Sequence, residues 1–233
     1  MISISFVEWC TGFKNDLKKL AGIAHKRGIP LVVDGAQGVG ALSLDVIDTG
    51  IDALACPTWK WLWGPLGLGF LYMKPEFMEQ ITPPFVGADG VAPTGDILDF
   101  QLRPADGMKR FEYSTKNYCD IIVFDKSLEL TLELGITAIE EALLKLTTDF
   151  MNEVEKAGYR IFGNYPRENR SGIFSFMVEK CTPEELLLKM RENGILANVR
   201  DGRLRIAPHV YSGREDAQHF GETLRTITAS LNY

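Results

Sequence analysis

The chain has 233 residues, of which 45% are hydrophobic and 24% are charged. This composition is typical of soluble globular domains and excludes a disordered, collagen-like or coiled-coil protein. The formal net charge of -6 at pH 7 provides no general basic field that would hold nucleic acid or an anionic membrane surface. Length and charge together favour a soluble enzyme or a small-molecule binding protein.

Residues that bind metals or form disulfides are sparse. Three histidines lie at no ligand spacing from the four cysteines, which form no CxxC pair: Cys10, Cys56, Cys119 and Cys181. We therefore predict no metal site. The first residues lack the basic region and the apolar run of a signal peptide, which favours the cytoplasm. The apolar stretch over 51–73 is broken by prolines and glycines and carries Lys60 near its middle, so we predict no membrane span there.

The first half of the chain alternates strands and helices. An amphipathic helix is predicted over 15–26, with Asn15 as its capping residue. The unbroken apolar run over 31–33 predicts a strand that is buried on both faces and ends at Asp34. Further strands are predicted over 3–7, 52–56 and 68–73. This pattern predicts an α/β fold with a mostly parallel sheet, in which ligands bind beyond the carboxyl ends of the strands.

The second half begins with an excursion over 82–109 that is rich in proline, glycine and aspartate. Two helices are predicted next, over 118–134 and 136–156, and the first of them has one apolar face: Ile121, Phe124, Leu128 and Leu132. The last third predicts a small α+β unit with strands over 175–178, 195–199 and 204–207. Its helices are predicted to begin at two capping boxes, Thr182/Glu185 and Ser212/Glu215. We expect a large domain over 1–135 and a small domain over 136–233.

Three residues near the predicted strand ends have the chemistry of a cofactor site. Lys60 stands among three tryptophans and before a glycine loop, which would exclude water, disfavour the charged ammonium and activate the amine for Schiff-base formation. A carboxylate such as that of Asp34 suits a protonated pyridine nitrogen. The amide of Gln37 suits a phenolic oxygen. Together these are the parts of a pyridoxal phosphate (PLP) site.

Each of these residues also has an ordinary structural role. Asp34 suits a turn or a helix cap, Gln37 a surface position, and Lys60 a cation–π contact with a neighbouring tryptophan. The glycine loop over 64–69 precedes a strand and lacks the GK[ST] signature, so it is neither a dinucleotide fingerprint nor a P-loop. The spacing alone therefore leaves the PLP site and the structural roles open.

Four segments carry a resemblance to a known family, and they occur in the family's order. They are 32–37 (VVDGAQ), 60–72 (KWLWGPLGLGFLY), 110–115 (RFEYST) and 204–211 (LRIAPHVY). On these segments the chain resembles class V aminotransferases of PLP fold type I, which include cysteine desulfurases and isopenicillin N epimerase-like proteins. The resemblance covers essentially the whole chain. It implies a PLP-dependent transferase that acts on an amino acid through a Lys60 Schiff base (aldimine) by transamination, epimerisation or elimination.

The resemblance also implies roles for individual residues. Lys60 would carry the Schiff base, Asp34 would face the pyridine nitrogen, and Gln37 would face the phenolic oxygen. Arg205 would bind the substrate α-carboxylate, a task suited to a bidentate guanidinium. Thr115 matches the threonine that reaches the cofactor phosphate of the neighbouring subunit, which implies a homodimer.

The positions before the lysine depart from the family pattern. The family commonly has Ser-x-His-Lys, whereas here Pro57 and Trp59 replace the serine and the histidine. Thr58 and the indole of Trp59 therefore remain as the phosphate-binding candidates. The interval 194–203 contains no cysteine, which disfavours a desulfurase of the cysteine-persulfide type.

The resemblance further implies that a long N-terminal portion of the family pattern is absent, including the ring-stacking residue and most phosphate ligands. We therefore expect a truncated protein that binds PLP weakly and has little turnover alone. One alternative is a non-catalytic fragment or partner subunit that completes a PLP site with a complementary N-terminal chain. Another is a lysine-dependent Schiff-base enzyme without PLP, for which borohydride would trap substrate on Lys60 in the absence of cofactor.

Overall fold

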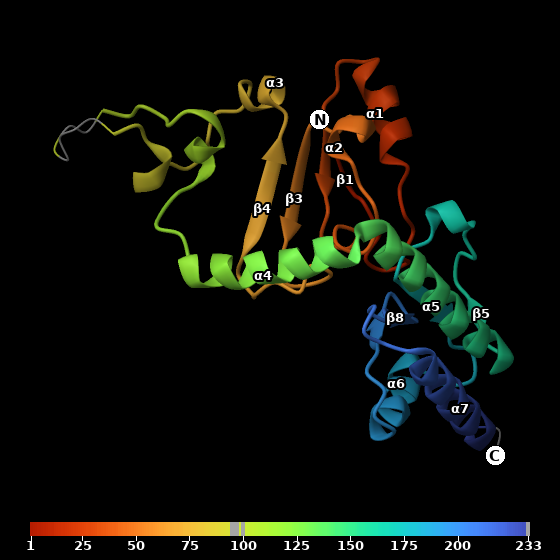
Figure 1. Cartoon of the computed structure of the whole chain (residues 1–233). Coiled ribbons are helices and arrows are strands. Elements are labelled where there is room, and N and C mark those ends of the chain that lie inside the picture. Colours follow the sequence, from red (N-terminus) through yellow and green to blue (C-terminus); the bar gives the residue numbers. More distant parts are fainter. Residues whose placement is uncertain (94–97, 99–100, 232–233) are drawn as a thin grey trace.

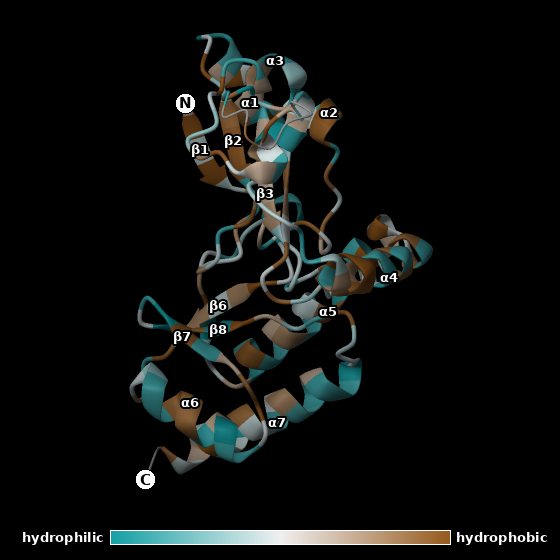
Figure 2. Cartoon of the chain, turned by 90° about the vertical axis from the view of Figure 1, so that its left-hand side faces the viewer, coloured by the Kyte–Doolittle hydropathy of each residue, from teal (hydrophilic) through white to brown (hydrophobic). Residues whose placement is uncertain are grey.

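The computed structural model describes residues 1–93, 98 and 101–231. Within them, two four-stranded sheets form two lobes that are joined by two consecutive long helices, α4 (Tyr118–Leu134) and α5 (Ile136–Lys156) (Figure 1). The bounds of these two helices are those predicted from the sequence. Figure 2 shows the lobes one above the other, with hydrophobic residues concentrated on the strands and on the inner faces of the helices.

The first sheet contains strands in the order β1 (Ile2–Ser5), β2 (Leu31–Asp34), β3 (Ala53–Pro57) and β4 (Gly69–Met73). The first three run parallel, whereas β4 pairs antiparallel with β3 because the glycine loop reverses the chain. Two helices connect the parallel strands: α1 (Leu17–His25) and α2 (Val46–Thr49). The predicted α/β fold with a mostly parallel sheet is confirmed for this lobe.

The start of α1 differs from the prediction. The helix begins after Asp16, whose carboxylate accepts the backbone N–H of Lys19 at 3.0 Å. The side-chain amide of Asn15 instead donates to the carbonyl of Ser5 at 2.9 Å, so Asn15 ties the end of β1 to the loop that follows it. Asn15 and Asp16 both have side chains that can cap a helix. Because Asn15 binds the end of β1, Asp16 is the residue that caps α1.

Beyond β4 the chain leaves the sheet as a long excursion, which lies at the upper left of Figure 1. It contains α3 (Pro75–Met78) and two short 3-10 helices, η1 (Ala88–Gly90) and η2 (Gly107–Phe111). Of the predicted excursion over 82–109, residues 94–97, 99 and 100 lie outside the described residues.

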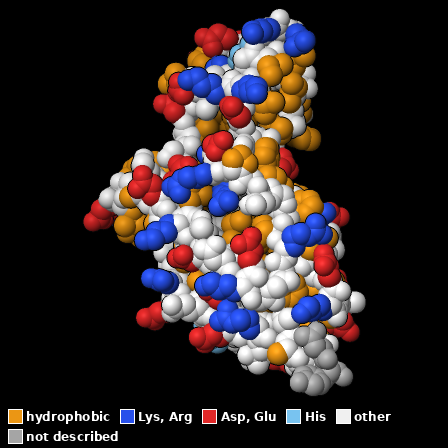
Figure 3. Space-filling model, turned by 90° about the vertical axis from the view of Figure 1, so that its right-hand side faces the viewer, with side chains coloured by type: hydrophobic (Ala, Val, Ile, Leu, Met, Phe, Trp, Pro, Cys, Tyr) orange, Lys and Arg blue, Asp and Glu red, His pale blue; other side chains and the backbone are white. Residues whose placement is uncertain are grey.

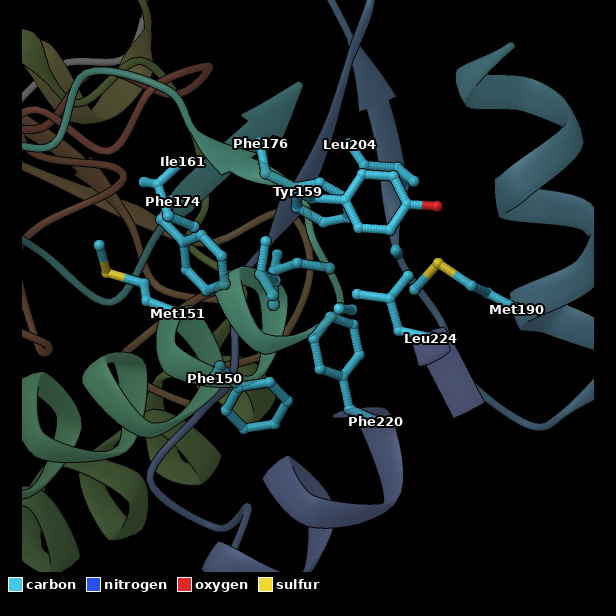
Figure 4. Close-up of a cluster of buried hydrophobic side chains, with 14 of the residues drawn as sticks. Phe150, Met151, Tyr159, Ile161, Phe174, Phe176, Met190, Leu204, Phe220 and Leu224 are labelled. Atoms are coloured by element: carbon cyan, nitrogen blue, oxygen red, sulfur yellow. The ribbon is translucent and has the colours of Figure 1, made fainter. Parts of the chain in front are cut away.

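The second sheet is antiparallel throughout and has the order β5 (Arg160–Ile161), β6 (Phe174–Met177), β8 (Arg203–Ile206) and β7 (Asn198–Arg200). The short helix η3 (Arg167–Asn169) lies between the first two of these strands in sequence. Buried phenylalanines and leucines from the sheet and from the helices beside it meet in one core, where Phe150, Phe176, Phe220, Leu204 and Leu224 point toward one another (Figure 4).

The two remaining helices cover this core, and their starts test the two predicted capping boxes. At α6 (Pro183–Glu192) the box is confirmed, since Thr182 and Glu185 exchange hydrogen bonds. At α7 (Arg214–Ser230) it is wrong, because Gly213 is the capping residue and Asp216 accepts its N–H at 2.7 Å. Helix α7 therefore begins one residue later than a Ser212 cap would allow.

Helix α5 contributes to both lobes. Leu143 belongs to the core of the first lobe, whereas Leu146, Phe150 and Val154 belong to the core of the second. The predicted boundary between residues 135 and 136 stays a prediction. The structure shows that the first half of α5 packs with the residues assigned to the large domain.

Helix α4 is far more exposed than its sequence suggested. Phe124 and Leu128 are half-buried, but Ile121 and Leu132, predicted to share their apolar face, are exposed, Leu132 by 72%. Thr131 is the one fully buried side chain of this helix. The apolar face predicted for α4 is thus only partly covered within the chain.

Among the described residues, none of the helices combines the length and the apolar character needed to cross a membrane. On the face shown in Figure 3, lysine and arginine side chains are interspersed with aspartate and glutamate, and apolar side chains gather on the upper lobe.

Candidate active site

The carboxyl ends of the parallel strands bring the predicted site residues to one edge of the first sheet. Asp34 is the last residue of β2 and lies opposite Ala55 of β3. Lys60 follows three residues after the end of β3. The first residue of β4, Gly69, pairs with Pro57, so the glycine loop lies at the same edge. The topology therefore places Asp34, Lys60 and the loop together, as the sequence predicted.

An open cavity of about 720 Å³ lies beside this edge. The carboxylate of Asp34 faces it from an exposed position, and its Oδ1 accepts the N–H of Ala36 at 2.8 Å. No cation lies within ion-pair distance of Asp34 in the part of the chain that the structure describes. The cavity is lined by Asp34, Ala36, Ala55, Cys56, Pro57, Trp59, Gly67, Leu68, Gly69, Phe70 and Leu71.

The amine of Lys60 is half-buried and lies 5.2 Å from the ring centroid of Trp59. Within the described residues it has neither a hydrogen-bond acceptor nor a carboxylate partner. Burial lowers the pKa of Lys60, the negative charge of Asp34 opposes this shift, and the positive charge of Arg205 adds to it. A lysine with a lowered pKa and no partner is suited to act as a nucleophile.

Gln37 and Thr58 occupy different environments. Gln37 is half-buried in the turn that follows β2. Thr58 is buried, and its hydroxyl lies 3.1 Å from the carbonyl oxygens of both Pro65 and Leu68. Its backbone N–H also donates to Leu68 at 3.0 Å. Both donors of Thr58 are thus used to hold the glycine loop.

Close packing explains why the loop needs glycine where it meets Thr58. A Cβ atom at Gly64 would lie 2.4 Å from the Cβ of Thr58 and 2.9 Å from the ring of Phe124 on α4. The N–H of Gly64 also donates to the carbonyl of Thr58 at 2.9 Å. The loop that follows Lys60 is therefore fixed against both β3 and α4.

Arg205 reaches the site from the second lobe. It lies on β8 between Ser175 of β6 and Asn198 of β7. Its Nε is buried and has no hydrogen-bond partner among the described residues. Burial, and then the positive charge of Arg200, lower the pKa of Arg205. A partly buried guanidinium without a counter-ion is suited to bind an anion such as a carboxylate.

The neighbouring Arg203 contrasts with Arg205. Its guanidinium pairs with Asp201 at 2.6 Å and lies over the ring of Phe162 at 3.8 Å. Both of its favourable partners are supplied by the chain itself, so Arg203 has a structural role. Of the predicted site residues, Asp34 and Trp59 line the cavity. The others are not among the described residues that line it: Gln37, Thr58, Lys60, Arg205 and Thr115, the last of which is exposed in the segment before α4.

Two thiols lie close to these charged groups. Cys10 lies 3.9 Å from the guanidinium of Arg203, on the strand of Arg205. No pattern in the sequence predicts this contact, because Cys10 and Arg203 are far apart along the chain. Burial, and then the negative charge of Asp34, raise the pKa of Cys56 to about 12, and the positive charge of Lys60 opposes this shift. The Cys56 thiol therefore stays protonated.

His209 is the residue near the site that sequence reasoning missed most clearly. Its ring stacks between Trp61 and Tyr211, at centroid distances of 5.0 and 4.7 Å. The indole N–H of Trp63 donates to the imidazole, with 2.8 Å between Nε1 and Nε2. Burial lowers the pKa of His209 to about 4. The three tryptophans near Lys60 in sequence therefore have different contacts. Trp59 contacts the amine of Lys60, whereas Trp61 and Trp63 contact His209.

The neutral state of His209 gives the stability of the fold a pH dependence. Its pKa is about 4 in the folded chain against 6.5 ordinarily, so between these values only the unfolded chain binds the proton. Stability is complete above the higher value and falls as the pH drops toward the lower one. Allowing for solvent screening of the half-buried ring, we expect a loss of about 2 kcal/mol.

Urea denaturation over this pH range measures that loss. The matched control is His209→Gln, in which no group at this position titrates, so its stability should vary less with pH. Equal pH slopes for the two proteins would contradict the assignment.

Comparisons with known proteins show the family to which the chain belongs. A family model described as aminotransferase class-V matches residues 1–215. A probable cysteine desulfurase of Pyrococcus abyssi is 27% identical over 250 residues, and the match covers 99% of this chain and 60% of the relative. An uncharacterized aminotransferase of Schizosaccharomyces pombe is 28% identical over 228 residues, covering 96% and 57%. The chain therefore belongs to the class V aminotransferase family.

A solved structure shows the same fold. A variant of the protein C-DES, with glycine covalently linked to its PLP cofactor, superposes with a TM-score of 0.87 at 22% identity, covering 96% of this chain and 59% of that one. The fold is that of PLP fold type I, and PLP is the cofactor of the family. The chain spans about half the length of the curated relatives it matches, between 52% and 60% for the first three.

Proposed function

We propose that this chain is a PLP-dependent amino-acid enzyme of the class V aminotransferase type. The observation that carries the proposal is that Lys60 and Arg205, two cations without a carboxylate partner among the described residues, lie close enough for the charge of Arg205 to act on Lys60. Burial lowers the pKa of both side chains. A nucleophilic amine can bond covalently to a cofactor aldehyde, and a guanidinium can bind the carboxylate of an amino acid. The two groups together suit an enzyme that holds an amino acid on a cofactor.

The residues would divide the work as follows. Lys60 holds the cofactor aldehyde covalently. Asp34, whose carboxylate has no cation of its own among the described residues, holds a proton on the pyridine nitrogen. Gln37 donates to the phenolic oxygen, and Arg205 orients the substrate through its carboxylate. When bound, PLP supplies the electron-withdrawing ring that transamination, epimerisation and elimination share.

The described residues fit the ring of PLP better than its phosphate. A cavity of about 720 Å³ beside Asp34 has room for an aromatic ring, and the indole of Trp59 lines it. Both donors of Thr58 already hold the glycine loop, and Pro57 has no N–H to offer. We therefore propose that this chain by itself binds PLP weakly, because of the two predicted phosphate-side residues, Thr58 and Trp59, only the indole N–H of Trp59 keeps a donor that is not used within the described residues.

The same residues exclude one type of reaction and are compatible with three others. The loop 194–203 has no cysteine, so desulfuration through a cysteine persulfide on that loop is not proposed. Transamination, epimerisation and elimination all need an amine, a ring-nitrogen partner and a carboxylate clamp, and Lys60, Asp34 and Arg205 supply these three.

A second candidate is a partner subunit that completes its site with another chain, either a second copy or a complementary N-terminal chain. It is favoured by uncovered apolar side chains around α4 and on the cavity side of β4: Tyr118, Ile122, Val123, Leu130, Leu132, Phe70 and Leu71. Large apolar side chains left exposed in this number are typical of a surface that another chain covers. In a homodimer, Thr115 would reach the phosphate of the partner's cofactor.

Titration with PLP, followed through the visible absorbance of the lysine-bound cofactor, tests the proposal. We expect the band to rise with PLP concentration and to be absent from Lys60→Ala. The matched control is Lys180→Ala, which removes an exposed lysine of the second lobe and should titrate like the wild type. An unchanged band in Lys60→Ala would overturn the assignment of Lys60 as the residue that bonds to PLP. Tight saturation by the wild-type chain alone would overturn the proposed weak binding.

A further inference from the structure

The backbone turn that carries Lys60 is strained. Trp63, three residues later, has a φ of 54°, and it is one of two non-glycine residues with positive φ in the described parts of the chain. The other, Asp201, occupies the tight turn between β7 and β8, where aspartate tolerates this conformation. A bulky tryptophan in this region is an outlier that persists only where its surroundings hold it.

Three contacts hold Trp63. Its backbone N–H donates to the carbonyl of Lys60 at 3.3 Å, and its own carbonyl accepts the hydroxyl of Ser127 on α4 at 3.1 Å. The third contact comes from the second lobe, where the imidazole of His209 accepts the indole N–H. Two of the three contacts thus reach the turn from other elements, and only the one from His209 joins it to the strand of Arg205.

His209 is itself fixed in orientation. Its ring lies nearly parallel to those of Trp61 and Tyr211, with interplanar angles of 21° and 10°. The backbone nitrogen of Val210 lies 3.0 Å from Nδ1 and the indole nitrogen of Trp63 lies 2.8 Å from Nε2, so both polar neighbours of the imidazole are donors. A neutral imidazole has one acceptor nitrogen and accepts one of the two. The shorter contact assigns that role to Nε2 and the ring proton to Nδ1. An imidazolium has no lone pair to accept either of them.

We propose that His209 is a positioning residue, whose neutral imidazole accepts the indole N–H of Trp63 and so holds the Lys60 turn at a fixed place relative to Arg205. Lys60 lies three residues before Trp63, and Arg205 lies four residues before His209. This contact between residues 146 positions apart therefore links the amine to the carboxylate clamp. Its functional meaning rests on the proposed function.

The environment of His209 supports a neutral acceptor. Burial is the sole cause of its lowered pKa, and the titratable group that faces it is the phenol of Tyr211, which stacks at 4.7 Å. The indoles of Trp61 and Trp63 complete its surroundings, so no carboxylate among these neighbours would stabilise the protonated form.

The test compares three substitutions in the full chain. His209→Phe keeps a ring between Trp61 and Tyr211 but removes the acceptor, whereas His209→Gln restores an acceptor without the ring. Tyr211→Leu is the matched control, because it removes a stacking ring and leaves the acceptor. Each protein is incubated with PLP and reduced with borohydride, and the labelled fraction of Lys60 is followed over time by peptide mass.

We expect His209→Phe to slow labelling of Lys60 at least tenfold, His209→Gln to recover most of the rate, and Tyr211→Leu to label like the wild type. The thermal midpoints of the four proteins show whether the slow labelling reflects unfolding. Wild-type labelling by His209→Phe, or slow labelling of all variants in proportion to their stability, would overturn the positioning role.

A second readout is independent of PLP. The indole N–H resonance of Trp63, assigned by its absence from Trp63→Phe, should shift upfield and lose protection from exchange in His209→Phe but not in Tyr211→Leu. If the wild type is not labelled at Lys60 at all, the proposed function fails, and this resonance alone decides the positioning role. An unchanged resonance in His209→Phe would overturn it.

Discussion

Replacing Arg205 by methionine is expected to stabilise the fold while it weakens recognition of the proposed amino-acid substrate. The guanidinium is partly buried, its Nε has no partner, and Arg200 adds a like charge, so the folded chain gains when the charge is removed. We expect a stabilisation of about 1–2 kcal/mol, since removing an uncompensated charge relieves its desolvation. Urea denaturation of the chain without cofactor measures this change.

The same substitution should weaken binding of an amino acid by about 100-fold, because the carboxylate loses its charged partner. The measurement is the change in the visible spectrum of the PLP-loaded protein when a panel of amino acids is titrated. Arg200→Met is the control for stability: its side chain is exposed, so we expect a change within about 0.5 kcal/mol. A destabilised Arg205→Met would show that the arginine has a structural role instead.

Replacing Gly12 by alanine is expected to be strongly destabilising. Gly12 has a φ of 75°, and a Cβ atom there would lie 1.8 Å from the carbonyl oxygen of Ile173. The clash is with backbone, so no side-chain rotation relieves it. We expect a loss of about 3 kcal/mol or more in the free energy of unfolding.

Gly28→Ala is the matched control, because Gly28 has a similar φ of 64° and no atom within 4 Å of its ideal Cβ. It should cost about 1–2 kcal/mol, the cost of the left-handed conformation alone. Equal losses for the two variants, measured by urea denaturation, would show that the contact with Ile173 carries no energy.

The position of Gly12 explains why this loss would reach the site. The carbonyl of Gly12 accepts the hydroxyl of Ser171 at 2.8 Å, and the carbonyl of Cys10 accepts that of Ser175 at 2.6 Å. Ser175 pairs with Arg205 across the second sheet. The loop after β1 is thus tied directly to β6, the strand beside Arg205, for which we propose the carboxylate-binding role.

The sequence predicted the elements well where local pattern determines them. Periodic apolar residues placed α4 and α5 at their observed bounds, and an unbroken apolar run placed β2 with Asp34 at its end. The carboxyl-edge rule for parallel strands then brought Asp34 and Lys60 together correctly. These features depend on residues close in sequence or on a general property of the fold.

The sequence failed where distant residues decide the outcome. Helix α4 has an apolar face, but periodicity cannot tell whether the chain itself covers that face. The histidine at position 209 looks like a turn residue until Trp61 and Trp63 are seen to enclose it. Cys10 likewise comes close to Arg203, on the strand of Arg205, only through the fold, because the two residues are far apart along the chain.

The single helix that enters both cores has a mechanical consequence. Leu143 is anchored in one core and Leu146 in the other, with no break in α5 between them. Swinging one half of the molecule over a bound amino acid as a rigid body would have to bend that helix or extract an anchored leucine. Any change in the spacing between the Lys60 amine and the Arg205 guanidinium is therefore left to individual side chains and to the glycine loop.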